Sequence, residues 1–123
     1  AVEKVQQFTS VCAPAPFQYA SVAAFTDPLS PNILAQYKEK RDLLINGIKG
    51  HYDVVVPKGA FYLFLRSPMD ATRFSEMLSK KGLAVVPGSA FGHYKDFIRI
   101  SYAISNEEIS QMINILLDVA KEK

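Results

Sequence analysis

Hydrophobic residues recur every three or four positions in three stretches of the chain, and this spacing predicts amphipathic helices. The longest stretch follows Ser30 and Pro31, which suit the N-cap and the first position of a helix. We interpret Gly47 and Gly50 as the end of this helix, which at about 20 residues would be roughly 30 Å long. Its apolar face consists of Ile33, Leu34, Tyr37, Leu44 and Ile48.

Two shorter helices are predicted closer to the C-terminus. The first is predicted to begin at Ser67, Pro68 and Asp70, which have capping-box character, and to end before Gly82. The second begins at Ser105, which has the spacing of a capping box with Glu108. The apolar stripes are Phe74, Met77 and Leu78 in the first helix, and Ile109, Met112, Ile113, Leu116, Val119 and Ala120 in the second.

Four short stretches between these helices have the composition of strands. Tyr52 to Val56 is rich in β-branched residues, and Leu83 to Val86 forms a short apolar run. Ala60 to Arg66 is apolar on both faces, which predicts an interior strand that is covered on both sides. Phe97 to Tyr102 alternates, with Ile98, Ile100 and Tyr102 on one face and Arg99 on the other. Pro87 to Gly92 is predicted to be a loop that reverses the chain.

The order of elements after residue 50 is therefore strand, strand, helix, strand, strand, helix. This order predicts an α/β (α+β) sandwich, with helices packed on a mostly antiparallel sheet. Upstream, Pro14 and Pro16 are interpreted as helix breakers, and a short apolar helix is predicted from Phe17 to Phe25. A boundary is predicted between Asp27 and Ser30, where prolines cluster.

Composition narrows the functional classes. The 14 basic and 12 acidic residues leave a net charge of +2 and form no basic stripe, so nucleic acid is not an expected partner. No apolar run approaches the roughly 20 residues that cross a bilayer, so no membrane partner is expected. Cys12 has no second cysteine to pair with, which agrees with a reducing, cytoplasmic location. His51 and His93 have no neighbours at metal-ligand spacing, and no metal site is expected.

Arg99 is the residue with the clearest chemical potential. A guanidinium offers a planar fork of donors that a carboxylate can accept with two parallel hydrogen bonds. The strand fixes the start of the side chain, so little order remains to be lost when a ligand binds. Taken alone, an arginine in a strand more often has a structural or solvated role, and the residue by itself favours that interpretation.

Four segments, in order, resemble the class I/II aminotransferases, the aspartate aminotransferase-like members of fold type I. They are PAPFQYA at residues 14–20, YKEKRDLL at residues 37–44, PKGAFY at residues 57–62, and VVPGSAFG at residues 85–92 followed by FIRISYA at residues 97–103. The third and fourth segments at this spacing are specific, and the resemblance extends over essentially the whole chain.

This resemblance implies the C-terminal part of such an enzyme. Residues 1–28 would be a remnant of the large, cofactor-binding domain, and residues 29–123 would be the linking helix and the small domain. Arg99 would bind the α-carboxylate of the amino acid. A loop close to the active site would contain Pro87, Gly88, Ser89 and Phe91. The small domain moves in this family, so closure over the substrate would exclude water and orient the reacting groups.

The resemblance also implies a cofactor, pyridoxal 5′-phosphate, that this segment does not hold. The family lysine that forms the Schiff base commonly lies in a Ser-x-x-Lys motif, and no serine here has a lysine three positions later. We therefore expect no catalytic and no cofactor-binding residue in this segment, and no activity of the isolated chain. The expected partners are an amino acid, a 2-oxo acid and the rest of the aminotransferase chain, with a homodimer in the complete enzyme.

Two other interpretations remain open at this point. Pyridoxal-phosphate-dependent β-lyases and aminocyclopropane-carboxylate synthases have a similar C-terminal half, and the residues that discriminate them lie upstream. A free-standing α/β module that binds a small carboxylate without catalysis also agrees with the composition and the order of elements. The long helix argues against such a module, because one small domain offers too little surface to cover it.

Overall fold

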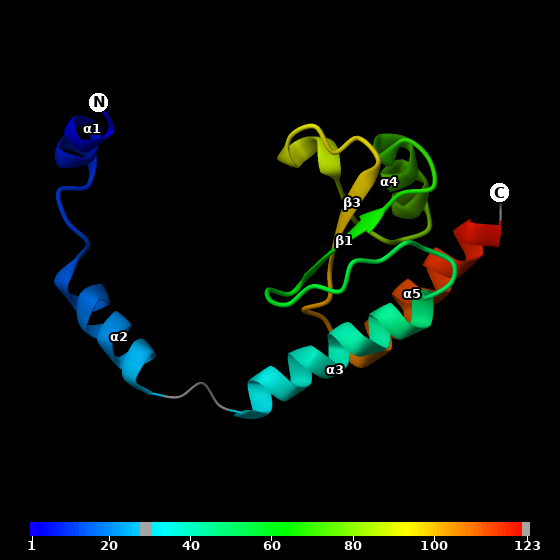
Figure 1. Cartoon of the computed structure of the whole chain (residues 1–123), viewed down its shortest axis with the longest axis horizontal. Helices are drawn as coiled ribbons and strands as arrows, with labels where there is room; N and C mark the ends of the chain where they lie inside the picture. Colours follow the sequence, from blue (N-terminus) through cyan, green and yellow to red (C-terminus); the bar gives the residue numbers. More distant parts are fainter. Residues whose placement is uncertain (28–30, 122–123) are drawn as a thin grey trace. The chain divides into compact units, whose positions relative to one another are not determined.

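The computed structural model describes residues 1–27 and 31–121, and the chain divides into two compact units, Ala1–Leu34 and Ala35–Lys123 (Figure 1). The first unit contains helices α1 (Val2–Thr9) and α2 (Ala15–Thr26), and neither helix has a buried residue. Helix α3 (Pro31–Ile48) begins in this unit and continues into the second. The predicted cap at Ser30 and the predicted boundary between residues 28 and 29 lie outside the described residues, so that division stays a prediction.

Helix α2 corrects one interpretation of the sequence. Pro14 lies between α1 and α2, as the prediction of a break requires, but Pro16 lies in the first turn of α2 and does not break it. Backbone N–H groups of the first turn have no partner within a helix, so a proline is tolerated there. The helix therefore starts two residues before the predicted Phe17 and ends at Thr26, next to the predicted Phe25.

The second unit is an α+β sandwich with an antiparallel sheet, as the sequence predicts. Strand β3 lies between β1 and β2, and both neighbours pair with it in antiparallel register. After α3, the elements are β1 (Tyr62–Arg66), α4 (Ala71–Lys80), β2 (Val86–Pro87), the 3₁₀ turn η1 (Gly88–Phe91), β3 (Phe97–Ser101) and α5 (Asn106–Lys121).

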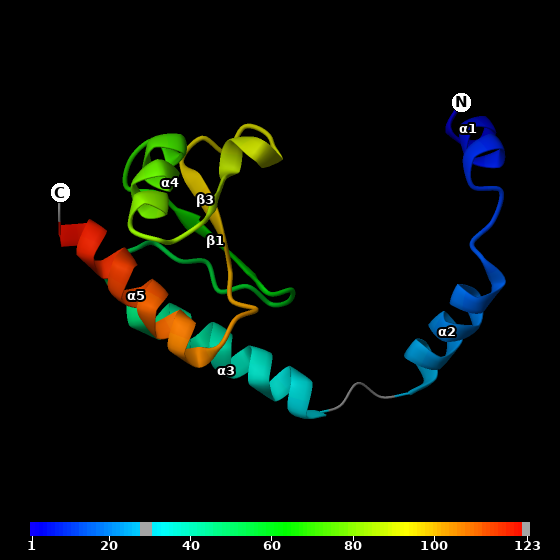
Figure 2. The same cartoon turned by 180° about the vertical axis from the view of Figure 1, so that it is seen from behind.

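The hydrophobic core lies between one face of the sheet and helices α3, α4 and α5. Figures 1 and 2 show α5 and the C-terminal part of α3 side by side. The fully buried members of this core come from three helices and two strands: Leu44 and Ile48 in α3, Leu63 and Leu65 in β1, Ala71, Phe74 and Leu78 in α4, Ile98 and Ile100 in β3, and Ile109 and Leu116 in α5. Helices α3, α4 and α5 pack on this face, whereas the turn η1 lies at the opposite face, where Phe91 contacts Phe64 of β1.

The predicted strand from Tyr52 to Val56 is wrong. Tyr52 makes an isolated bridge to Lys49, and Val54 makes one to Leu65, but no continuous ladder forms. Strand propensity becomes a strand only where a partner strand and a packing surface are present. Strand β1 also differs from its prediction, because it lies at the end of the strand order and buries one face instead of two.

The predicted strand from Leu83 to Val86 is displaced to β2, because Leu83 completes the end of α4. The Leu83 N–H donates to Leu78 O at 2.9 Å, and the Gly82 N–H donates to Ser79 O at 3.0 Å. These two bonds form a Schellman motif, which requires Gly82 at its positive φ of 88°. The chain can enter β2 only after this motif is complete.

Gly47 does not end α3 but lies inside it, where α3 and α5 approach closely. A Cβ atom at Gly47 would be 2.5 Å from Cδ1 of Ile113 in α5. The absence of a side chain therefore permits the close packing of the two helices. Periodicity in the sequence indicates the helix but not this contact.

The predicted start of α5 is confirmed, and α4 starts at the predicted Asp70, while Ser67 lies before the helix and does not cap it. Asp70 accepts hydrogen bonds from the N–H groups of Thr72 and Arg73 at the start of α4. Before α5, the Ser105 N–H donates to a Glu108 carboxylate oxygen at 2.8 Å, and the Glu108 N–H donates to Ser105 Oγ at 3.2 Å. These reciprocal bonds form the capping box and lower the pKa of Glu108.

Tyr52 is expected to make the stability of the second unit depend on pH in the alkaline range. Its hydroxyl donates to Leu116 O in α5 at 2.7 Å, and burial raises its pKa from 10.0 to about 12. Between these values the unfolded chain releases the phenolic proton while the folded chain retains it, so the free energy of unfolding falls as pH rises. Tyr52→Phe is expected to lower the free energy of unfolding by about 1 kcal/mol at neutral pH. This difference in stability from wild type should shrink as pH rises from about 10 to about 12.

Urea unfolding across this pH range measures the effect. Tyr94→Phe is a matched control, because it removes the same hydroxyl from a side chain that is exposed. A constant difference between wild type and Tyr52→Phe across the range would contradict the assignment of this titration to Tyr52.

Candidate functional site

Arg99 occupies the middle of β3, the central strand of the sheet. Alternation along this strand directs Ile98 and Ile100 into the core and leaves Arg99, half-buried, on the opposite face. Its neighbours across the sheet are Phe64 in β1 and Val86 in β2. The sequence prediction that Arg99 lies opposite a buried face is therefore confirmed.

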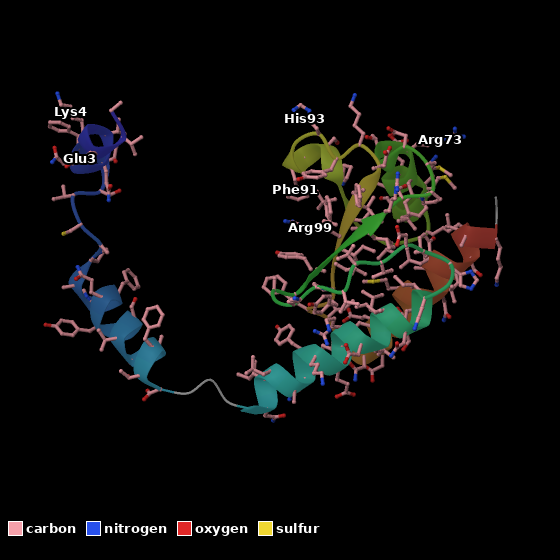
Figure 3. All side chains as sticks on the ribbon, viewed as in Figure 1. Glu3, Lys4, Arg73, Phe91, His93 and Arg99 are labelled. Atoms are coloured by element: carbon pink, nitrogen blue, oxygen red, sulfur yellow. The ribbon has the colours of Figure 1, made fainter. Side chains whose placement is uncertain are left out.

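The Arg99 guanidinium lies over two aromatic rings. Its central carbon is 4.2 Å from the ring centroid of Tyr62 and 4.4 Å from that of Phe91. Figure 3 shows Arg99 and Phe91 on the same side of β3, away from α4 and from Arg73 on that helix. Within residues 1–27 and 31–121, no hydrogen bond or ion pair holds the guanidinium. The contacts of this charged group are thus with aromatic faces and not with a carboxylate.

An aromatic cluster continues from Phe91 across the outer face of the sheet; it comprises Phe64, Phe91, Tyr94 and Phe97. Phe64 is its centre, stacked on Phe97 with ring centroids 5.0 Å apart and planes inclined by 2°. Tyr94 and Phe91 approach Phe64 edge-on at 5.4 and 6.4 Å. Sequence analysis did not identify this cluster, although aromatic residues at alternate positions of β1 were the available signal.

The segment predicted to lie near the active site forms η1 and the end of β2. Gly88–Phe91 is a 3₁₀ turn, and the chain reverses between the antiparallel strands β2 and β3, as the sequence predicts. Phe91 lies against Arg99, while Pro87 belongs to β2 and Ser89 is exposed. Gly88 is buried, and a Cβ atom there would meet the carbonyl oxygens of Tyr94 and Phe97.

This geometry is suited to binding an anion. The donors of a guanidinium lie in its plane, so rings on its faces leave the edges accessible to a carboxylate. The two rings that the guanidinium lies over carry no carboxylate that would compete for its donors. Arg99 can therefore orient a carboxylate at this site.

Over residues 1–27 and 31–121, no three His, Cys, Asp or Glu side chains are placed to hold a metal ion. No helix in that part of the chain is long and apolar enough to cross a membrane.

Comparison with known proteins agrees with the resemblance seen in the sequence. The family model described as aminotransferase class I and II matches residues 1–116. An aspartate aminotransferase of Thermococcus kodakarensis is 41% identical over 105 residues, which cover 81% of this chain and 29% of the relative. A probable aspartate aminotransferase of Methanocaldococcus jannaschii is 31% identical, over 94% of this chain and 32% of the relative.

Solved structures show the same similarity. The crystal structure of an aspartate aminotransferase from Thermotoga maritima has a TM-score of 0.82 at 32% identity, and the match covers 98% of this chain and 32% of that one. An aromatic aminotransferase from Pyrococcus horikoshii has a TM-score of 0.78 at 34% identity, over 97% of this chain and 34% of that one. The chain thus spans about a third of the length of the proteins that it matches.

Proposed function

Because the chain belongs to the aminotransferase class I and II family, we propose that it forms the carboxylate-binding part of an aminotransferase. The complete enzyme would transfer an amino group between an amino acid and a 2-oxo acid. In this proposal, residues 29–123 are the linking helix and the small domain, and residues 1–28 belong to the large domain. The observation that carries the proposal is the half-buried Arg99 guanidinium, which has no carboxylate partner among the described residues.

Arg99 binds the α-carboxylate in this proposal. Both substrates, the amino acid and the 2-oxo acid, carry a carboxylate next to the reacting carbon, so one anchor serves both halves of the reaction. A bidentate arginine fixes the direction of that carboxylate as well as its position. Fixing the carboxylate also restricts where the adjacent carbon can lie, which is how binding assists a reaction that other groups perform. Pro87, Gly88, Ser89 and Phe91 form the neighbouring wall of the site.

The family is generally dependent on pyridoxal phosphate, and the residues of this chain do not fit that cofactor. A Schiff base requires a lysine at the site, but the groups that contact Arg99 are the rings of Tyr62 and Phe91. No Ser-x-x-Lys motif occurs in the sequence. We therefore propose that residues outside these 123 hold the cofactor, which supplies the electron sink of the reaction. The part played by this chain is to bind and orient the substrate.

The first unit supports an interaction with further polypeptide. Helices α1 and α2 bury no residue, and they expose large apolar side chains such as Phe17, Val22 and Phe25. Exposed apolar surface of this kind is typical of a region that another part of a protein covers. We propose that the rest of the aminotransferase chain covers it, that the complete enzyme is a homodimer, and that it functions in the cytoplasm.

The reading frame around this sequence tests the proposal directly. We expect the frame to continue upstream of Ala1 and to encode a Ser-x-x-Lys motif after a strand. The longer protein should bind pyridoxal phosphate, with the absorbance of a Schiff base, and should transaminate. The chain of 123 residues should do neither.

The opposite results would favour a different function. A natural gene that begins at Ala1 would favour a free-standing module that binds a small carboxylate. Transamination by the chain of 123 residues alone would contradict the proposed division of roles, because it would require a Schiff-base lysine within this sequence.

A further inference from the structure

We infer that Tyr62 and Phe91 are positioning residues that clamp the Arg99 guanidinium, holding its hydrogen-bonding edges ready for a carboxylate; this inference rests on the proposed function. The two rings come from different elements, β1 and η1. Neither ring would bond to the substrate carboxylate. Both would act through the arginine between them.

The contact distances support a clamp of two rings. The guanidinium carbon is 4.2 Å from the Tyr62 centroid and 4.4 Å from the Phe91 centroid, within the range of cation–π contacts. Tyr62 and Phe91 make no ring contact with each other, although each contacts a further ring. This arrangement is expected when the two rings lie on different sides of the cation.

Each ring is itself held in place. Tyr62 belongs to the β1–β3 ladder, and its ring centroid lies 4.4 Å from that of Phe61. Phe91 ends η1 and contacts Phe64 of the aromatic cluster edge-on. Gly88 fixes the start of η1 against the backbone of the segment that leads into β3. The clamp is therefore attached to the sheet on both sides.

The clamp leaves the chemistry of the arginine free. Aromatic faces attract the cation without using its N–H donors, which project from the edges of the guanidinium plane. An ion pair would also order the side chain, but it would occupy those donors and compete with the substrate. A long side chain that is already ordered loses less freedom on binding, so the clamp should strengthen the affinity for a carboxylate.

Nuclear magnetic resonance of the Arg99 side chain in the full chain of 123 residues tests this inference. The probe is sodium acetate, with sodium chloride at equal ionic strength as the reference. In wild type we expect an ordered Arg99 Nε–H group whose resonance shifts with acetate. In Tyr62→Leu and Phe91→Leu we expect a mobile Nε–H group and acetate binding weakened about two- to tenfold.

Two further variants separate clamping from general packing. Tyr62→Phe keeps the ring and should retain wild-type order and affinity. Tyr94→Leu removes a ring of the same aromatic cluster that makes no cation–π contact with Arg99, and it should also behave as wild type. Circular dichroism confirms that each variant is folded.

The possible outcomes distinguish the clamp from the proposed function. A mobile Arg99 Nε–H group in wild type, or unchanged order and affinity in both leucine variants, would overturn the clamp and leave the carboxylate role standing. An ordered Arg99 that loosens in the leucine variants supports the clamp. If that ordered group did not respond to acetate even in wild type, the proposed carboxylate role would fail instead.

Discussion

Replacement of Arg99 by lysine, in the longer protein that carries the catalytic lysine, is expected to lower kcat/KM for amino acids by about two orders of magnitude. Lysine keeps the positive charge but offers a single ammonium in place of the planar fork, so the bidentate contact is lost. A hydrogen bond to a charged group contributes about 1.5–3 kcal/mol, and a loss of about 3 kcal/mol corresponds to this effect. Steady-state kinetics with an amino acid and with its 2-oxo acid measures it.

The Arg99→Lys variant should also differ from wild type in a characteristic way between substrates. If Arg99 acts as an anchor in both half-reactions, its replacement by lysine should raise KM for the amino acid and for the 2-oxo acid alike. A primary amine that lacks the carboxylate should react equally slowly with the wild-type enzyme and with the Arg99→Lys variant. Arg73→Lys is a matched control, because Arg73 is exposed on α4 and points away from Arg99 (Figure 3). Equal kcat/KM values for Arg99→Lys and Arg73→Lys would contradict the proposed role of Arg99.

Replacement of Gly88 by alanine is expected to lower the free energy of unfolding by about 3 kcal/mol. The new methyl group would collide with Tyr94 O and would lie 2.7 Å from Phe97 O. Both atoms belong to the backbone, so neither can rotate away as a side chain could. Relief requires η1 or the start of β3 to move, which disturbs close-packed surroundings. Thermal unfolding should show a Tm lower by about 10 °C or more.

Ser89→Ala is the control in the same turn, because Ser89 is exposed and its change should alter stability by less than about 0.5 kcal/mol. Movement of η1 should also shift Phe91 away from Arg99, so the Arg99 Nε–H resonance of Gly88→Ala should move toward that of Phe91→Leu. A Tm for Gly88→Ala within about one degree of Ser89→Ala would show that η1 tolerates a side chain at this position.

The local signals in the sequence predicted local structure well. Asp70 and the Ser105–Glu108 pair identified two helix starts, because capping involves groups within three or four positions of each other. Alternation from Phe97 onward predicted β3 and the face on which Arg99 lies. The resemblance to aminotransferases, which rested on four segments in order, two of them specific at their spacing, is confirmed by the family match.

The predictions that were wrong have one cause: the structure there depends on contacts between segments that are distant in the sequence. Tyr52 to Val56 has the composition of a strand, but it makes only isolated bridges. Gly47 resembled a helix end because its packing partner, Ile113, is far away in the sequence. Residues close in sequence do not determine either structure, because the contacts that determine it are made with other elements.

The sequence by itself determined the buried faces and the caps of α4 and α5, the alternation of β3 and the family, because each depends on residue types at short or defined spacing. The predicted face of α3 is buried only at Leu44 and Ile48, while Ile33, Leu34 and Tyr37 are exposed. Only the tertiary structure decided what surrounds Arg99. Antiparallel pairing and the η1 turn bring Tyr62 and Phe91 onto the guanidinium from separate parts of the chain. An arginine in a strand is equally able to form an ion pair, to remain solvated or to stack on rings. Which of these occurs depends on the groups that folding places within about 4–6 Å of it.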